Sequence, residues 1–123
     1  MNVYLVGGAV RDMLLGRLPH EWDYAFDGSR QAFLAAHPGA EIVGAVQVCL
    51  WQGCEFMPLR GTGILADLRA RDLTINALAL DAAGRLYSHP QALHDLRHRL
   101  LRPASPAALA DDPARAFRLA RFA

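Results

Sequence analysis

The 123-residue chain is 53% hydrophobic and 20% charged with a formal net charge of +1, a composition typical of one ordinary globular domain. All of its basic side chains are arginines, which excludes both the lysine of a Walker-type phosphate loop and a Schiff-base lysine. Two cysteines are too few for a structural zinc site or a disulfide scaffold, and no apolar run approaches the roughly 18–20 residues that span a bilayer.

The chain opens on an apolar strand that two glycines interrupt. Residues 3–6 predict a buried strand, Gly7 and Gly8 end it, and residues 9–15 predict a helix that stops near Gly16. At such a turn, backbone N–H groups without helical partners point outward at the positive end of the helix dipole. This pattern predicts a seat for a phosphate group.

Two carboxylates follow on the next predicted strand, residues 21–26. Side chains alternate along a strand, so Glu21 and Asp23 are expected on one face, with roughly 6.5–7 Å of backbone between them. From there their oxygens can converge on divalent cations. A phosphate seat facing two carboxylates is typical of metal-assisted phosphoryl transfer.

The middle of the chain predicts short helices and strands in alternation. In order, these are a helix capped by Ser29 and ending at residue 36, a strand at 41–50, its hairpin partner at 54–57, a short helix beginning at Ile64, a strand at 74–80 and a short strand at 85–87. Beyond residue 88 we expect helices, interrupted at Pro103 and Pro106.

The carboxyl-terminal part is basic. From Arg97 onward six arginines stand against two aspartates, whereas acidic residues outnumber arginines before it. Asp111 or Asp112 is expected to cap a last helix with Pro113 in its first turn. A stripe recurs every third residue along that helix, at Arg115, Arg118 and Arg121. A basic half suits polyphosphate or RNA, and a merely solvated arginine-rich helix is the alternative.

Four ordered motifs resemble the head domain of the class II nucleotidyltransferases, the family of the CCA-adding tRNA nucleotidyltransferases and the bacterial poly(A) polymerases. They lie at residues 5–12 (LVGGAVRD), 71–78 (RDLTINAL), 95–102 (DLRHRLLR) and 112–123 (DPARAFRLARFA). The resemblance implies the α+β nucleotidyltransferase (polymerase-beta-like) fold, with a mixed, mostly antiparallel sheet flanked by helices. It also implies a catalytic head domain at residues 1–110 and the start of a helical neck domain at residues 111–123, truncated in this chain.

The same resemblance implies addition of CMP and AMP, from CTP and ATP, to the 3′ end of tRNA, with Mg²⁺ as cofactor. Glu21 and Asp23 would be the catalytic carboxylates and would hold the metal. The residues implied to bind the nucleotide are Gly8, Arg11, Arg71, Asp112, Arg115, Arg118 and Arg121.

Within that set the expected roles differ. Gly8 would approach the triphosphate through its backbone, and Arg11 would clamp phosphate with a bidentate guanidinium. Asp112 and Arg115 would read the Watson–Crick edge of the incoming base, because an acceptor beside a donor suits both cytosine and adenine. Asp112 is equally competent as a plain helix cap.

The sequence departs from the family pattern at several points. Glu21 stands where the family has aspartate and is one methylene longer, about 1.5 Å, so we expect metal binding with reduced activity. Residues 60–64 are much shorter than the family's flexible loop, which is associated with the switch from C to A addition, and Ala70 replaces the first of two adjacent arginines. The alternatives are therefore a poly(A) polymerase, an A-only enzyme, or a catalytically weak NTP-binding remnant.

Other polar residues are not assigned a main catalytic or nucleotide-binding role. Glu55 is a candidate third metal-site carboxylate, whereas Asn76 is expected only to satisfy backbone at a strand start. His94 and His98 lie four residues apart and predict an exposed helix face rather than a metal site. The amino terminus enters a strand without a basic-then-apolar leader, so a cytoplasmic protein that does not associate with membranes is expected.

Overall fold

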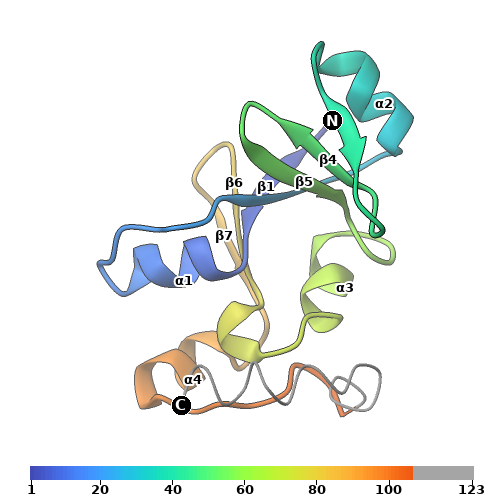
Figure 1. Ribbon diagram of the computed structural model, residues 1–123. Helices are drawn as coiled ribbons and strands as arrows, with labels where there is room; N and C mark the ends of the chain where they lie inside the picture. The colour runs from blue at the N-terminus through green and yellow to red at the C-terminus, as the bar shows by residue number, and fades with distance from the viewer. Residues whose placement is uncertain (107–123) are drawn as a thin grey trace.

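The computed structural model describes residues 1–106, which form one mixed seven-stranded sheet with helices on both faces (Figure 1). The strands follow the order β3-β4-β5-β2-β1-β6-β7, and β2 and β5 are the one parallel pair among them. Strand bounds are β1 Val3–Val6, β2 Asp23–Phe26, β3 Glu41–Val43, β4 Val48–Trp51, β5 Cys54–Pro58, β6 Leu78–Asp81 and β7 Leu86–Ser88. Helix bounds are α1 Gly8–Leu14, α2 Arg30–Ala36, α3 Ile64–Arg69, the 3₁₀ turn η1 Thr74–Asn76, and α4 Ala92–His98.

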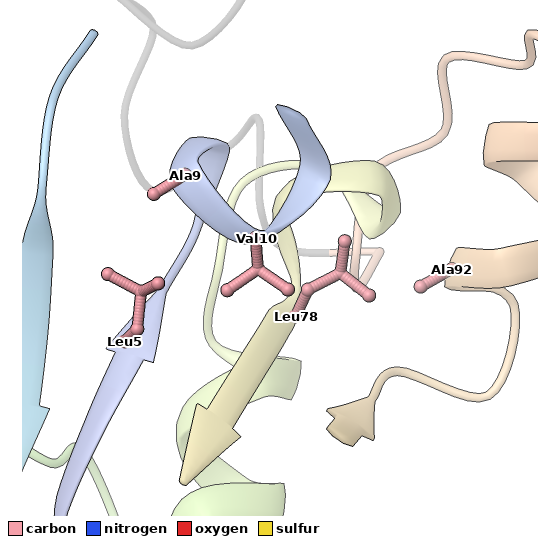
Figure 2. Close-up of a cluster of buried hydrophobic side chains, with 5 residues drawn as sticks. All are labelled: Leu5, Ala9, Val10, Leu78 and Ala92. Atoms are coloured by element: carbon pink, nitrogen blue, oxygen red, sulfur yellow. The ribbon is translucent and has the colours of Figure 1, made fainter. Parts of the chain in front are cut away.

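Alternation along the central strands separates two apolar layers. On one face, Leu5 and Leu78 pack against Ala9 and Val10 of α1, with Ala92 of α4 at the edge of the cluster (Figure 2). A neighbouring cluster, which Tyr24 joins to the first, holds α2 through aromatic contacts: the ring of Phe33 stacks on Phe26 and lies tilted against Phe56.

The opposite face belongs to α3. There the buried side chains of Val6, Ala25 and Ala79 pack against Leu68. Asp23 pairs with Val6 in the β1–β2 register, so it begins β2 on this second face, at the edge where β1 ends. Within residues 1–106, no helix is long and apolar enough to cross a membrane.

The predicted strand at residues 41–50 is wrong, because the structure has two strands there. A turn separates β3 from β4, with Gly44 at φ 76° and Gln47 at φ 57°, and the Gln47 N–H donates to the Gly44 carbonyl at 3.2 Å. The Gln47 carbonyl also accepts from Arg30 Nε at 2.8 Å. Weak alternation did not distinguish a long strand from a hairpin that α2 secures by this contact.

The predicted strands at 21–26 and 74–80 both begin later than expected. Asp23 is the first residue of β2, so Glu21 precedes the strand and the alternation argument does not apply to it. Residues 74–76 form the turn η1, because the Thr74 N–H donates to the Arg102 carbonyl at 3.0 Å instead of to a neighbouring strand. The strand β6 starts only at Leu78.

Helix α4 is shorter than the helical tail expected beyond residue 88. It ends at His98, and Arg99 follows in the left-handed region at φ 56°. The Leu100 N–H then donates back to the Asp95 carbonyl at 2.8 Å, which closes the helix end. The last helix expected from residue 111 lies outside the described residues.

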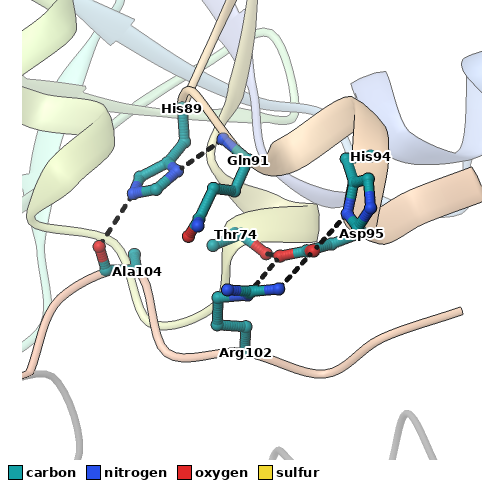
Figure 3. Close-up of polar contacts among 7 residues, drawn as sticks. All are labelled: Thr74, His89, Gln91, His94, Asp95, Arg102 and Ala104. Carbon is teal, nitrogen blue, oxygen red and sulfur yellow. Dashed lines mark hydrogen bonds and ion pairs between the residues drawn. The ribbon is translucent and has the colours of Figure 1, made fainter. Parts of the chain in front are cut away.

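The carboxylate of Asp95 on α4 is fully buried and joins α4 to η1 (Figure 3). It accepts from Thr74 Oγ1 at 2.6 Å, from His94 Nδ1 at 3.1 Å, and from Arg102 Nε and Nη2 at 3.0 and 3.2 Å. Burial opposes its charge, but these donors outweigh that effect and lower the pKa of Asp95 below its ordinary value of 3.8.

This lowered pKa predicts acid sensitivity. A carboxylate with a depressed folded pKa stabilises the fold above its unfolded pKa, and the stabilisation disappears as pH falls through the folded pKa. We expect Asp95→Asn to cost about 2 kcal/mol at about pH 6 and much less at about pH 3. Urea unfolding of both proteins at the two pH values measures this. An equal loss of unfolding free energy at the two pH values would contradict the prediction.

Candidate active site

A pocket of about 470 Å³ lies where β1 ends and α1 begins. Five residues singled out from the sequence line it together: Gly8, Arg11, Glu21, Asp23 and Arg71. A larger hollow of about 690 Å³ borders it at Arg11, but Glu21 and Asp23 do not line that hollow. The smaller pocket therefore combines the carboxylates, the glycine turn and two of the arginines.

The turn at Gly7 is part of the sheet as well as the start of α1. Gly7 has φ 73° and ψ −137°, a conformation that glycine adopts without steric cost. Its N–H donates to the Leu78 carbonyl at 3.0 Å, and its carbonyl accepts from the Arg11 N–H at 3.2 Å. The predicted seat thus begins at Gly8, because the Gly7 N–H is already used inside the fold.

The guanidinium of Arg11 is held in place by two side chains. Its Nη1 donates to Asn76 Oδ1 at 2.7 Å, while Nε and Nη2 both donate to Asp12 Oδ1, at 3.2 and 3.1 Å. Only 17% of the arginine side chain is exposed. Asn76 therefore orients an arginine, whereas the sequence had suggested only a backbone contact for it.

Gly8 leaves little room beside this guanidinium. A Cβ at Gly8 would lie 3.2 Å from Arg11 Nη2. We expect Gly8→Ala to displace the end of the Arg11 side chain and to weaken Mg·CTP binding about tenfold with little change in stability. Gly63→Ala is the matched control, because its Cβ would meet nothing within 4 Å. Calorimetric titration compares the two, and equal affinities would contradict the prediction.

Asp23 lies among negative charges. Its burial raises its pKa above the ordinary value, the nearby carboxylates of Glu55 and Glu21 raise it further, and Arg71 opposes them. Glu55 is the residue directly beside Asp23 in the parallel β2–β5 register. A divalent cation would relieve this repulsion, so the donor chemistry fits a hard, oxygen-liganded metal.

The described residues contain no group of three His, Cys, Asp or Glu side chains arranged to hold a metal ion. His94 and His98 lie with their rings 4.4 Å apart on α4 and do not line the pocket.

Arg71 is positioned by a buried carboxylate that sequence reasoning did not single out. Asp67 is 1% exposed and accepts from Arg71 Nε at 2.9 Å, with Nη2 at 2.8 Å from the same oxygen. Its other oxygen accepts from the Arg60 N–H at 2.8 Å. The four-residue spacing of Asp67 and Arg71 was the available signal, although Arg71 lies two residues beyond the end of α3.

The remaining predicted nucleotide-binding residues, Asp112, Arg115, Arg118 and Arg121, lie outside the described residues. The pocket has further polar lining residues that were not predicted as ligands, namely Asp12, His20, Asp72 and Asn76. Three of these four fall inside the motifs at residues 5–12 and 71–78, so motif membership was the signal that could have found them.

Residues 3–45 match a family model described as the poly A polymerase head domain. The whole chain aligns with the multifunctional CCA proteins of Pasteurella multocida at 37% identity and Pseudomonas putida at 40%, covering 34% and 39% of their lengths. The chain thus spans little more than a third of the length of these curated relatives.

Solved structures of CCA-adding enzymes also match the chain over almost its whole length. The chain matches the Bacillus stearothermophilus CCA-adding enzyme in complex with CTP with a TM-score of 0.85 and 29% identity, over 98% of this chain and 34% of that one. It matches the Thermotoga maritima CCA-adding enzyme complexed with tRNA with a TM-score of 0.80 and 30% identity, over 98% and 33% respectively. The expected nucleotidyltransferase fold is confirmed.

Proposed function

Because the chain belongs to the class II nucleotidyltransferase family, we propose that it is the catalytic head of an enzyme that adds CMP and AMP, from CTP and ATP, to the 3′ end of tRNA. Its relatives include a multifunctional CCA protein and CCA-adding enzymes in complex with CTP or tRNA, and this supports the assignment. Residues 1–110 would form the head, and residues 111–123 would begin a neck.

One observation carries the proposal: Gly8, Arg11, Glu21, Asp23 and Arg71 all line a single pocket. Two fixed guanidiniums and the amino-terminal end of α1, which begins at Gly8 in this pocket, suit the phosphates of a nucleotide. Two carboxylates beside them suit the metal that accompanies a triphosphate. Asp12 and Asn76 already hold Arg11, and Asp67 already holds Arg71. Nucleotide binding therefore costs little additional side-chain entropy at these arginines.

The site residues would have different roles in the reaction. Arg11 and Arg71 would bind phosphate oxygens and spread the negative charge that develops during transfer. Glu21 and Asp23 would hold Mg²⁺, which when bound activates the 3′-hydroxyl of the RNA and neutralises the leaving pyrophosphate. Asp112 and Arg115 would select the base, and Arg118 and Arg121 would complete the nucleotide site.

A narrower specificity is the second candidate, and the connection between β5 and α3 favours it. Only residues 59–63 link the two elements, and Arg60 ties this link to α3 through Asp67 and the Ala70 carbonyl. The alignment with the Pasteurella protein spans 145 residues, 22 more than the chain has. Since the family's longer loop is associated with the switch from C to A addition, an enzyme that adds only part of CCA would fit this short link.

Labelled nucleotide transfer tests both candidates. The protein is incubated with tRNA lacking its CCA end, Mg²⁺ and either CTP, ATP or both, and the products are resolved by length. Three added nucleotides support CCA addition, whereas CMP or AMP alone supports the narrower specificity. Binding of Mg·CTP without incorporation by the full-length protein would instead support an NTP-binding remnant.

A further inference from the structure

The orientation of Arg11 depends on a residue 65 positions further along the chain, Asn76. The contact from Arg11 Nη1 to Asn76 Oδ1, at 2.7 Å, is shorter than either contact to Asp12. A guanidinium presents its donors in a rigid plane, so fixing one edge sets the direction of the others. Whatever holds Asn76 therefore also holds the phosphate-binding face of Arg11.

Asn76 belongs to η1, a short turn that is weakly stabilised by its own hydrogen bonds. It ends η1, a single 3₁₀ turn, and such turns have poor internal hydrogen-bond geometry. Two contacts at Thr74 fix that turn from outside: its N–H donates to the Arg102 carbonyl at 3.0 Å, and its Oγ1 donates to Asp95 Oδ2 at 2.6 Å. The hydroxyl contact is the side-chain anchor of η1.

Asp95 is well suited to be a fixed point. It is fully buried on α4, and Arg102 binds both of its oxygens from the segment that runs back past η1 (Figure 3). An isolated bridge between Leu73 and Pro103 also joins that segment to the residue directly before η1. A buried carboxylate bound on both oxygens has little freedom to move.

We propose that Asp95 and Thr74 are positioning residues that set the orientation of Arg11 through η1 and Asn76. The function of this chain of contacts rests on the proposed function, because it acts on the arginine that binds the triphosphate. Neither Asp95 nor Thr74 lines the pocket with Glu21 and Asp23, so their effect on nucleotide affinity is indirect.

Paired substitutions at Thr74 test the proposal. Thr74→Val keeps the shape and removes the hydroxyl, and we expect Mg·CTP to bind about tenfold more weakly, whereas Thr74→Ser restores the hydroxyl and the affinity. Phe33→Leu, in the core beneath α2, is the stability-matched control and should leave affinity unchanged. Equal affinity losses in Thr74→Val and Phe33→Leu would overturn the proposal.

A double-mutant cycle then identifies the route. If Thr74 acts through Arg11, Thr74→Val costs about tenfold in the wild-type background and almost nothing when Arg11 is already replaced by methionine. Additive effects of Thr74→Val and Arg11→Met would show that Thr74 influences binding by another route and would overturn the inference.

A measurement without nucleotide separates this inference from the proposed function. In the wild-type protein, the side-chain N–H protons of Arg11 should exchange slowly with water by NMR, and Thr74→Val should speed that exchange while Phe33→Leu does not. Unchanged exchange in Thr74→Val overturns the positioning role. If the wild-type protein binds no Mg·CTP, the proposed function fails, while this exchange result still decides the role of Thr74.

Discussion

Asp23→Asn is expected to lower CMP transfer by at least about a thousandfold while making the folded domain more stable. The loss follows because a neutral amide cannot replace a carboxylate that holds a divalent cation. Several kcal/mol of transition-state stabilisation are at stake, and each 1.36 kcal/mol is worth about tenfold in rate.

The gain in stability follows from the sign of the pKa shift. Burial and the charges of Glu55 and Glu21 raise the pKa of Asp23, so its charged form is less favourable in the folded protein than in the unfolded chain. This cost is present at neutral pH and disappears as pH falls below the unfolded pKa. Removing the charge by Asp23→Asn should therefore raise the urea midpoint near neutral pH, and the rise should vanish in acid.

Asp81→Asn is the matched control. It makes the same change from aspartate to asparagine at a residue whose pKa is lowered rather than raised. Hydrogen bonds from the N–H groups of Arg85 and Ala83 and from the Tyr87 hydroxyl lower the pKa of Asp81. We expect Asp81→Asn to reduce stability and to leave transfer unchanged. Transfer that survives in Asp23→Asn, or a lower urea midpoint for that variant near neutral pH, would contradict the prediction.

The correct sequence predictions rest on interactions between near neighbours in the chain. The strand Val3–Val6, the glycine turn, the start of α1 and the cap at Ser29, whose side chain accepts from the Ala32 N–H at 3.1 Å, each depend on a few adjacent residues. The motifs identified Gly8, Arg11 and Arg71. The pair of carboxylates on the second predicted strand added Glu21 and Asp23. All five line one pocket, although their individual roles stay predictions.

The errors arose where distant residues decide the local conformation. Thr74 and Ile75 are β-branched, which favours a strand. Arg102 and Asp95 instead bind the polar groups of Thr74, and the chain turns into η1. A single sequence cannot show that Asn76 meets Arg11, because the contact exists only after β1 and β6 have paired. Tertiary contacts decided these positions against local propensity.

The second large effect is expected at Arg71. Arg71→Met leaves the carboxylate of Asp67 buried and without its guanidinium, and breaking a buried ion pair in this way costs about 3 kcal/mol. The same change removes a cation from the nucleotide pocket and should weaken Mg·CTP binding about tenfold or more. Denaturant unfolding and calorimetric titration measure the two losses separately.

A second substitution separates these two roles of the arginine. In Asp67→Asn/Arg71→Met the buried charge is gone, and the amide oxygen still accepts the Arg60 N–H, so much of the lost stability should return. Nucleotide affinity should not return with it, because the guanidinium of Arg71 is still missing from the pocket. Recovery of both would make Arg71 a structural residue only. Failure to recover stability would mean that the loss in Arg71→Met comes from the arginine's packing rather than from the unpaired Asp67.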